Sequence, residues 1–189
     1  MKQVTLIAVV ALVCAIAVPG AATSNLALRG VGGAVSMVDA DDIDMTVGFN
    51  LLFDLGMVAD KVGLEAYGMY WQQTEDNFGI EASLRDVAFG ARAKYLVPMQ
   101  SGSIHPFAGG GLGLHIVTAA VNTPAYDFGG GLTVPATSID ETELKLGLDI
   151  GAGALFDVGA KAGILTDVWY TMAPDVSQLS LRAGLMFKL

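Results

Sequence analysis

The last twelve residues of the chain, QLSLRAGLMFKL at positions 178–189, alternate between a wholly apolar set and a mixed set. The apolar set is Leu179, Leu181, Ala183, Leu185, Phe187 and Leu189. A period of two predicts a β-strand with one continuous apolar face, because a helix would scatter these residues around its circumference. Such a strand promotes aggregation in water unless its edges and its apolar face are both covered. A closed barrel in a membrane covers both.

The composition supports a membrane environment. The chain is 53% hydrophobic and only 15% charged, whereas soluble domains carry roughly 25% charged residues. No long apolar run occurs after the N-terminal segment. We therefore expect strands whose apolar faces are covered by lipid.

The first 22 residues have the pattern of a secretory signal peptide. Lys2 gives a basic start, residues 4–18 are nearly all apolar, and small residues follow at 19–22. The apolar stretch is shorter than the roughly 20 residues of a membrane-spanning helix. We expect cleavage near Ala21 or Ala22, which leaves residues 23–189 as one barrel domain. The single cysteine, Cys14, would leave with the signal, so the mature chain has no disulfide or thiol chemistry.

Eight segments of the mature chain fit antiparallel strands joined in sequential hairpins. The predicted strands are residues 25–38, 43–54, 62–71, 84–97, 104–117, 143–156, 160–170 and 178–189. Short connections alternate with longer ones, and residues 72–81 and 118–142 are predicted to be outer loops. With odd strands running outward, aromatic residues gather at two levels, as in the girdles of membrane barrels. The outer girdle would contain Tyr70, Trp71, Trp169 and Tyr170, and the inner one Phe53, Tyr95, Phe107, Phe156 and Phe187.

The C-terminal residues Arg182, Gly184, Phe187 and Leu189 match the assembly signal of bacterial outer-membrane barrels, with Leu in place of the usual terminal Phe. Together with the export signal and the eight strands, they make the chain resemble the small eight-stranded outer-membrane β-barrel proteins of the OmpX, NspA and OmpA membrane-domain type. The resemblance implies an all-β fold, an eight-stranded antiparallel up-and-down transmembrane β-barrel in the bacterial outer membrane. It also implies a monomer that contacts outer-membrane lipid and lipopolysaccharide and the barrel-assembly machinery during biogenesis.

Charged residues lie on the strand faces opposite the apolar ones. They are Arg29, Glu65, Asp86, Arg92, Lys94, Glu143, Lys145, Asp149, Asp167 and Arg182. Both signs are nearly balanced, and an eight-stranded barrel is just wide enough for side chains to fill it. We predict a lumen charge network that plugs the barrel, with an ion path or catalytic carboxylates as the alternatives. Evenly spaced glycines on the same faces would relieve crowding there, because no helix follows them as a phosphate-binding loop requires.

No motif predicts a catalytic site, a metal site or a cofactor. His115 could act as a hydrolase base with Glu143 or a loop serine, but position 117 is Val117 and no nucleophile motif surrounds the histidine. The acidic loop at 39–44 lacks the glycine and distal Glu of a calcium loop, so we expect a solvated loop or weak divalent-ion contact with lipopolysaccharide phosphates. A net charge of −9 makes a nucleic-acid partner unexpected.

The sequence therefore predicts a non-enzymatic envelope protein that makes surface contacts through its external loops, above all the long loop at 118–142. A narrow conduit for small hydrophobic solutes and a lipid-modifying enzyme are the alternatives. A soluble lipocalin-like barrel is the structural alternative, and it would place Leu148 and Leu185 inside the barrel.

Overall fold

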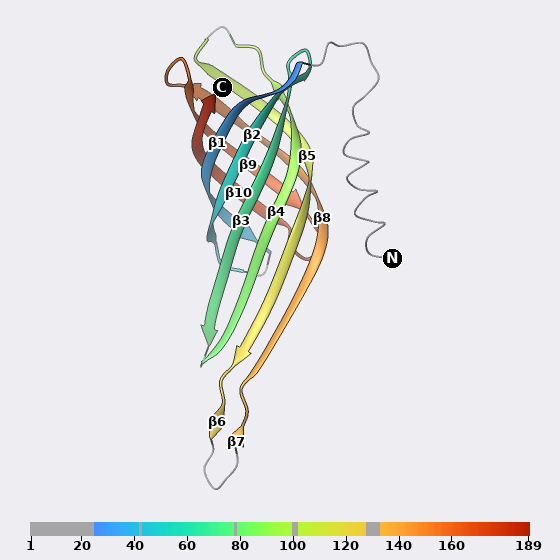
Figure 1. Cartoon of the computed structure of the whole chain (residues 1–189), viewed down its shortest axis with the longest axis vertical. Coiled ribbons are helices and arrows are strands. Elements are labelled where there is room, and N and C mark those ends of the chain that lie inside the picture. Colours follow the sequence, from blue (N-terminus) through green and yellow to red (C-terminus); the bar gives the residue numbers. More distant parts are fainter. Residues whose placement is uncertain (1–24, 42, 78, 100–101, 128–132) are drawn as a thin grey trace.

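The computed structural model describes residues 25–41, 43–77, 79–99, 102–127 and 133–189 (Figure 1). The predicted signal peptide, 1–22, lies outside the described residues. Eight long strands form the barrel, and two short ones form a hairpin at one end. The barrel strands are β1 (Asn25–Ala40), β2 (Thr46–Ala59), β3 (Val62–Asn77), β4 (Ile80–Leu96), β5 (Ile104–Thr123), β8 (Thr137–Asp157), β9 (Ala162–Met172) and β10 (Gln178–Lys188). The hairpin consists of β6 (Tyr126–Asp127) and β7 (Thr133–Val134).

The eight strands form a closed ring in the order β1-β10-β9-β8-β5-β4-β3-β2, and all neighbours are antiparallel. The ring closes between the first and last strands, where Ala34 pairs with Gly184. Each strand follows its neighbour along the chain, so the connections are simple hairpins. The predicted eight-stranded antiparallel up-and-down barrel is confirmed.

The two faces of the wall differ as the alternation predicts. Leu148 and Leu185 lie on the outside with 53% and 49% of their surface exposed, whereas Asp149 and Arg182 are buried inside. An apolar exterior around a charged interior is the arrangement of a membrane barrel and the reverse of a lipocalin. The soluble alternative is therefore rejected.

Helices do not provide a membrane anchor in the described part of the chain, where none is long and apolar enough to cross a bilayer.

Four strands extend into segments that the sequence predicted to be loops. Residues 72–81 and 118–142 were expected to be loops, but β3 continues to Asn77, β4 begins at Ile80, β5 continues to Thr123 and β8 begins at Thr137. The prediction failed because residues 72–77 are polar on both faces and the apolar residues at 80, 82, 84, 119 and 121 lie on the opposite face from those of the lipid-facing band, although the backbone pairing continues. Residues 72–77, 80–85, 118–123 and 137–142 form a four-stranded sheet that projects beyond the ends of the other four strands (Figure 1). We call it the protruding sheet.

Candidate functional site

A charge cluster near the inner end of the lumen joins four strands. Arg182 on β10 donates hydrogen bonds to Asp167 on β9, from Nε to Oδ1 at 2.7 Å and from Nη2 to Oδ2 at 2.6 Å. The same guanidinium lies 3.5 Å from Glu65 on β3, and Glu65 pairs with Lys94 on β4. Each of the four charged residues occupies a lumen-facing position in the alternation of its own strand, so all four side chains point inward. Pairing of opposite charges reduces the free-energy cost of burying them.

A second cluster lies further out and centres on Asp149. Arg92 donates to its Oδ2 at 2.9 Å, the Tyr67 hydroxyl donates to the same oxygen at 2.8 Å, and Thr171 donates to Oδ1 at 2.6 Å. The Arg92 guanidinium also stacks on aromatic rings, 3.8 Å from the Tyr67 centroid and 4.2 Å from that of Trp169. Sequence reasoning did not place these uncharged partners in the network, although their strand parity is that of the neighbouring charged residues.

His115 and Asp86 form an isolated pair at the outer end of the lumen. The Nδ1 atom of His115 lies 2.8 Å from Oδ2 of Asp86, and both side chains are fully buried. The Nε2 atom of His115 has no hydrogen-bond partner among the described residues. The hydrolase arrangement with Glu143 is not formed, because Glu143 contacts Lys145 instead.

Two residues of the predicted lumen network, Glu143 and Arg29, lie elsewhere, and Lys145 lies on the lumen side near the outer rim. Lys145 pairs with Glu143 at 3.1 Å and with Asp175 at 3.0 Å, and Glu143 and Asp175 are exposed at the outer rim of the barrel. Arg29 is exposed at the opposite end and faces outward. Arg29 has the same parity along β1 as Val35 and Met37, which are 50% and 51% exposed, so alternation along the strand places it on the outer face.

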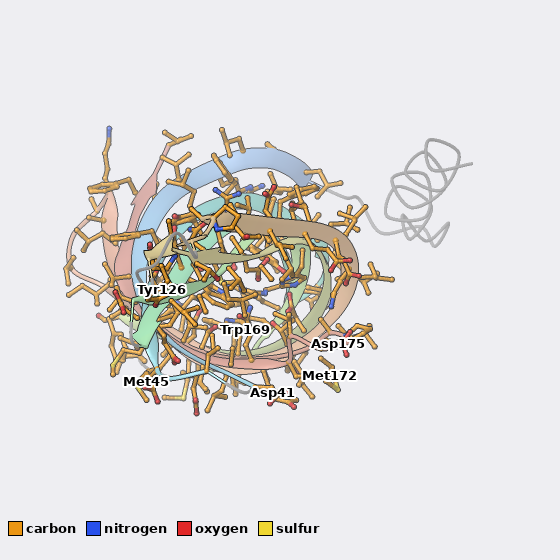
Figure 2. All side chains as sticks on the ribbon, turned by 90° about the horizontal axis from the view of Figure 1, so that it is seen from below. Asp41, Met45, Tyr126, Trp169, Met172 and Asp175 are labelled. Atoms are coloured by element: carbon orange, nitrogen blue, oxygen red, sulfur yellow. The ribbon has the colours of Figure 1, made fainter. Side chains whose placement is uncertain are left out.

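Aromatic residues occur at two levels of the outer wall, with three corrections to the predicted girdles. Trp71 and Trp169 are fully buried, and Phe107 is 4% exposed; all three point into the lumen. Figure 2 looks into the ring from the protruding side and shows Trp169 inside it, with Asp41 and Asp175 at the rim. Trp71 lies on the same face of β3 as the inward-facing Glu65, so its position inside the barrel could have been predicted from the sequence. Of the predicted girdle residues, those that face outward are Tyr70 and Tyr170 at the outer level and Phe53, Tyr95, Phe156 and Phe187 at the inner level.

Glycines on the inner face make room for large side chains. A Cβ atom added to Gly151 would lie 2.6 Å from Cε3 of Trp169, and one added to Gly147 would lie 2.8 Å from Nε2 of His115. These glycines are therefore positions where a side chain from the neighbouring strand lies over the backbone.

The residues of the predicted C-terminal signal divide between the two faces of β10. Arg182 is buried in the lumen, whereas Phe187 and Leu189 face outward with 50% and 76% exposure. A Cβ atom added to Gly184 would lie 2.7 Å from Cα of Ala34 on β1, so glycine permits close approach at the seam where the barrel closes.

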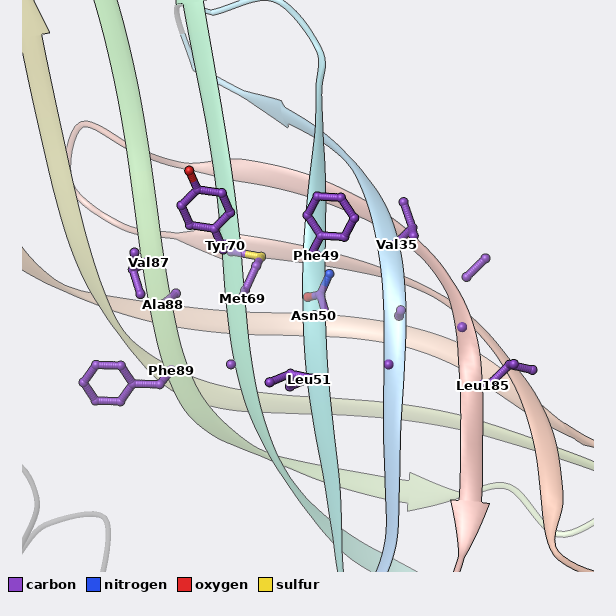
Figure 3. Close-up of a pocket in the computed structure, with 15 residues that line it drawn as sticks. Val35, Phe49, Asn50, Leu51, Met69, Tyr70, Val87, Ala88, Phe89 and Leu185 are labelled. Carbon is purple, nitrogen blue, oxygen red and sulfur yellow. The ribbon is translucent and has the colours of Figure 1, made fainter.

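An apolar hollow of about 730 Å³ lies on the lipid-facing wall across β10, β1, β2, β3 and β4 (Figure 3). Its sides include Phe49, Tyr70 and Phe89, and its floor includes Gly33 and Gly68, which have no outward side chain. At this height, between the two aromatic levels, acyl chains would fill it.

The described residues do not group into a metal centre: no three His, Cys, Asp or Glu side chains among them could hold an ion together. Residue 42 of the acidic loop lies outside the description, and Asp41 is fixed through its backbone N–H, which donates to the carbonyl of Ser177 at 2.9 Å.

The protruding sheet has two free edges, of which the longer runs along β8. Residues 137–147 of β8 pair with β5, but pairing with β9 begins only at Leu148. The opposite margin, on β3, is free beyond Trp71, where pairing with β2 stops. A strand edge of this length exposes a row of backbone N–H and C=O groups that can pair with another chain.

A closed barrel with an apolar exterior, short turns at the end where Asn25 and Leu189 lie, and long strands at the other end defines a transmembrane barrel of the outer-membrane class. The sequence matches the family model described as outer membrane protein beta-barrel domain over residues 8–187. The chain belongs to this family, whose members are placed in the bacterial outer membrane.

Solved structures have the same fold. Neisserial surface protein A aligns with a TM-score of 0.65 and 15% identity, covering 85% of this chain and 96% of that one. Ail, the attachment invasion locus protein of Yersinia pestis, aligns with a TM-score of 0.52 and 19% identity over 86% and 97% of the two chains. A major outer membrane protein from Thermus thermophilus aligns with a TM-score of 0.61 and 8% identity over 86% and 100%. No curated protein matches the sequence significantly.

Proposed function

We propose that this barrel is a non-enzymatic envelope protein that makes surface contacts through its protruding sheet. The observation that supports the proposal is the free edge of β8, which leaves residues 137–147 unpaired on one side. Partners that recognise such an edge add a strand to it through main-chain hydrogen bonds. The sheet projects from the end opposite Asn25 and the C-terminus, which is the external end in this class of barrel (Figure 1).

The lumen supports a structural role for the rest of the barrel. Trp71, Trp169 and Arg182 are fully or almost fully buried there, and the charged groups are paired across strands. Side chains that fill the interior favour a rigid support for the sheet rather than the conduit for hydrophobic solutes. The Nε2 atom of His115 makes no hydrogen bond to a hydroxyl group among the described residues, so this histidine does not have the activated nucleophile that the enzyme alternative requires.

A matched pair of deletions tests the proposal. In the trimmed variant, residues 73–84 and 119–141 are each replaced by Asn-Gly, because Gln72 pairs with Arg85 and Thr118 with Thr142 in a register that a two-residue turn can close. In the control, only the tip at 124–136 is replaced. Both variants should insert and show heat-modifiable migration on gels.

Cells that express each variant are then compared for attachment to sister bacteria and to cultured host cells. The trimmed variant should lose the attachment conferred by the full chain, whereas the control should retain most of it. Equal attachment by cells expressing the full and trimmed chains would contradict the proposal.

A further inference from the structure

The two faces of the protruding sheet differ in polarity, although both lie outside the lipid-facing band. Eleven of the twelve side chains on the outer face are polar or charged: Gln72, Thr74, Asp76, Glu81, Ser83, Arg85, Thr118, Asn122, Ser138, Asp140 and Thr142. The inner face continues the lumen side of the strands and has an apolar stripe over β4, β5 and β8. This stripe consists of Ile80, Ala82, Leu84, Ala119, Val121 and Ile139.

The apolar stripe is continuous across strands and is exposed. Ala82 pairs with Val121, and Val121 pairs with Ile139. Ile139 is 65% exposed and Val121 is 42% exposed. Lipid surrounds the outside of the barrel and does not reach this face, which lies beyond the outer mouth of the barrel. An apolar surface of this kind in water marks an interaction site.

A shallow hollow lies at the base of the stripe. It has a volume of about 260 Å³, and Ile43 from the β1–β2 connection lines it together with Leu84 and Val121. Glu75 and Gln73 of β3 line its other side. The hollow therefore combines an apolar floor with a carboxylate at its margin.

The charges around this face select the kind of partner. Glu75 and Glu141 lie on the inner face itself, and Asp41, Asp44 and Asp175 lie on the connections at the barrel mouth. Lys145 is the nearby cation on the same side of the strands, and it is already paired with Glu143 and Asp175. A second copy of the chain would bring the same negative charge and be repelled, whereas a cationic partner would be attracted.

We propose that the inner face of the protruding sheet binds a cationic amphipathic helix of a partner, with the apolar side of the helix against the stripe and its Lys and Arg residues toward Glu75 and Glu141. The stripe is about 13 Å long from Leu84 to Ile80 and about 10 Å wide from β4 to β8. A helix is about 10–12 Å in diameter and rises 5.4 Å per turn, so two to three turns fit. This inference rests on the proposed surface-contact function and assigns it a partner class.

Binding of a synthetic peptide to the full chain in nanodiscs of zwitterionic lipid tests the proposal. The probe is a fluorescent helical Leu/Lys peptide of about twelve residues, with a scrambled peptide of the same composition and empty nanodiscs as backgrounds. Fluorescence anisotropy gives the dissociation constant. The scrambled peptide should bind at least tenfold more weakly, because it cannot present one apolar side.

Four double variants distinguish binding at the inner face from binding at the outer face, and each inner-face variant has an outer-face control. V121S/I139S removes the apolar stripe and A120S/S138A changes the outer face at adjacent positions. E75Q/E141Q removes two inner charges and E81Q/D140N removes two outer ones. We expect each inner pair to weaken binding about tenfold or more and each outer pair to change it less than twofold, with unchanged heat-modifiable migration in all four variants.

Unchanged binding in V121S/I139S would overturn the proposal, as would equal losses in E75Q/E141Q and E81Q/D140N, which would indicate diffuse attraction to negative charge. The proposed surface-contact function has a separate readout. If trimming the sheet abolishes cell attachment but V121S/I139S does not affect peptide binding, only this inference fails. If the peptide binds as expected but trimming leaves attachment intact, only the surface-contact function fails.

Discussion

Arg182 and Asp167 lie directly opposite each other on β10 and β9 and join through two parallel hydrogen bonds of 2.7 and 2.6 Å inside the barrel. The fork of the guanidinium matches the two carboxylate oxygens, which makes this pair geometrically specific. A shift in the register of β10 by one residue would turn Arg182 toward lipid. We infer that the pair fixes the register of the last strand as the barrel closes.

Replacing Arg182 with Leu should destabilise the folded barrel, because Asp167 would keep a buried charge without its main partner. Breaking a buried pair on one side costs about 3–5 kcal/mol. Heat-modifiable gel migration after graded heating in detergent measures the effect, and the transition should move to lower temperature. The double variant R182L/D167L should recover part of the loss. An unchanged transition in R182L would show that the pair does not stabilise the barrel.

Tyr70 and Trp71 are neighbours in sequence but lie on opposite sides of the wall. Trp71 is fully buried and donates from Nε1 to Oε1 of Gln178 at 2.8 Å, whereas Tyr70 is 40% exposed to lipid. Replacing Trp71 with Ala should cost about 3–5 kcal/mol, and the same change at Tyr70 should cost much less. Urea unfolding of the barrel in lipid vesicles distinguishes the two. Equal losses would contradict the inward placement of Trp71.

The strands that cross the membrane could be predicted from sequence because lipid and lumen impose opposite chemistry on alternate residues. Leu148 beside Asp149 and Leu185 beside Gly184 show this rule directly, and their placement follows it. The rule fails beyond Gln72 and Thr118, where water surrounds both faces of the strands. The lengths of the strands in the protruding sheet therefore required cross-strand pairing information that periodicity does not contain.

The lumen charges could be assigned to a face, but their pairing could not be predicted from sequence. Strand parity places Glu65, Arg92 and Asp149 inside, yet the partner of each depends on the tilt of the strands and on which side chains cross the lumen. Tyr67 on β3 and Arg92 on β4 both reach Asp149 on β8, although neither strand is adjacent to β8 in the ring. The predicted aromatic girdles were partly wrong. Trp71 and Trp169 lie near the outer ends of their strands, but their parity along those strands places both side chains inside the barrel.

Asp157 ties three strands at the inner rim, beyond the lipid-facing Phe156. Lys188 of β10 donates to its Oδ1 at 2.8 Å, and Nε2 of His105 lies 3.1 Å from Oδ2. These hydrogen bonds, chiefly that from Lys188, hold the pKa of Asp157 below its ordinary value. A lowered carboxyl pKa stabilises the folded state above the ordinary pKa of about 3.9, and the contribution is lost as pH falls through the lowered value.

Replacing Lys188 with Met should therefore raise the pKa of Asp157 toward its ordinary value. Carboxyl carbon NMR of the folded barrel in detergent, titrated between neutral and acidic pH, measures the midpoint in both proteins. Lys161 is exposed at the same end of the barrel, so Lys161→Met serves as a control for the loss of one positive charge. The same midpoint in the wild type and the Lys188 variant would show that this ion pair does not form in solution.

Gly151 and Gly68 lie on opposite faces of the wall and should respond differently to the same substitution. A Cβ atom at Gly151 would lie 2.6 Å from the Trp169 ring, which is fully buried and stacked against Arg92, so the ring has little room to move. Overpacking of this kind costs about 1–3 kcal/mol. Gly68 faces lipid, and a Cβ atom there would have no neighbour within 4 Å. Because glycine weakens a strand by about 0.5–1 kcal/mol relative to alanine, Gly68→Ala should be neutral or stabilising. Urea unfolding in vesicles gives both values, and a Gly151→Ala variant as stable as the wild type would mean that the lumen is less tightly filled than the packing around Trp169 indicates.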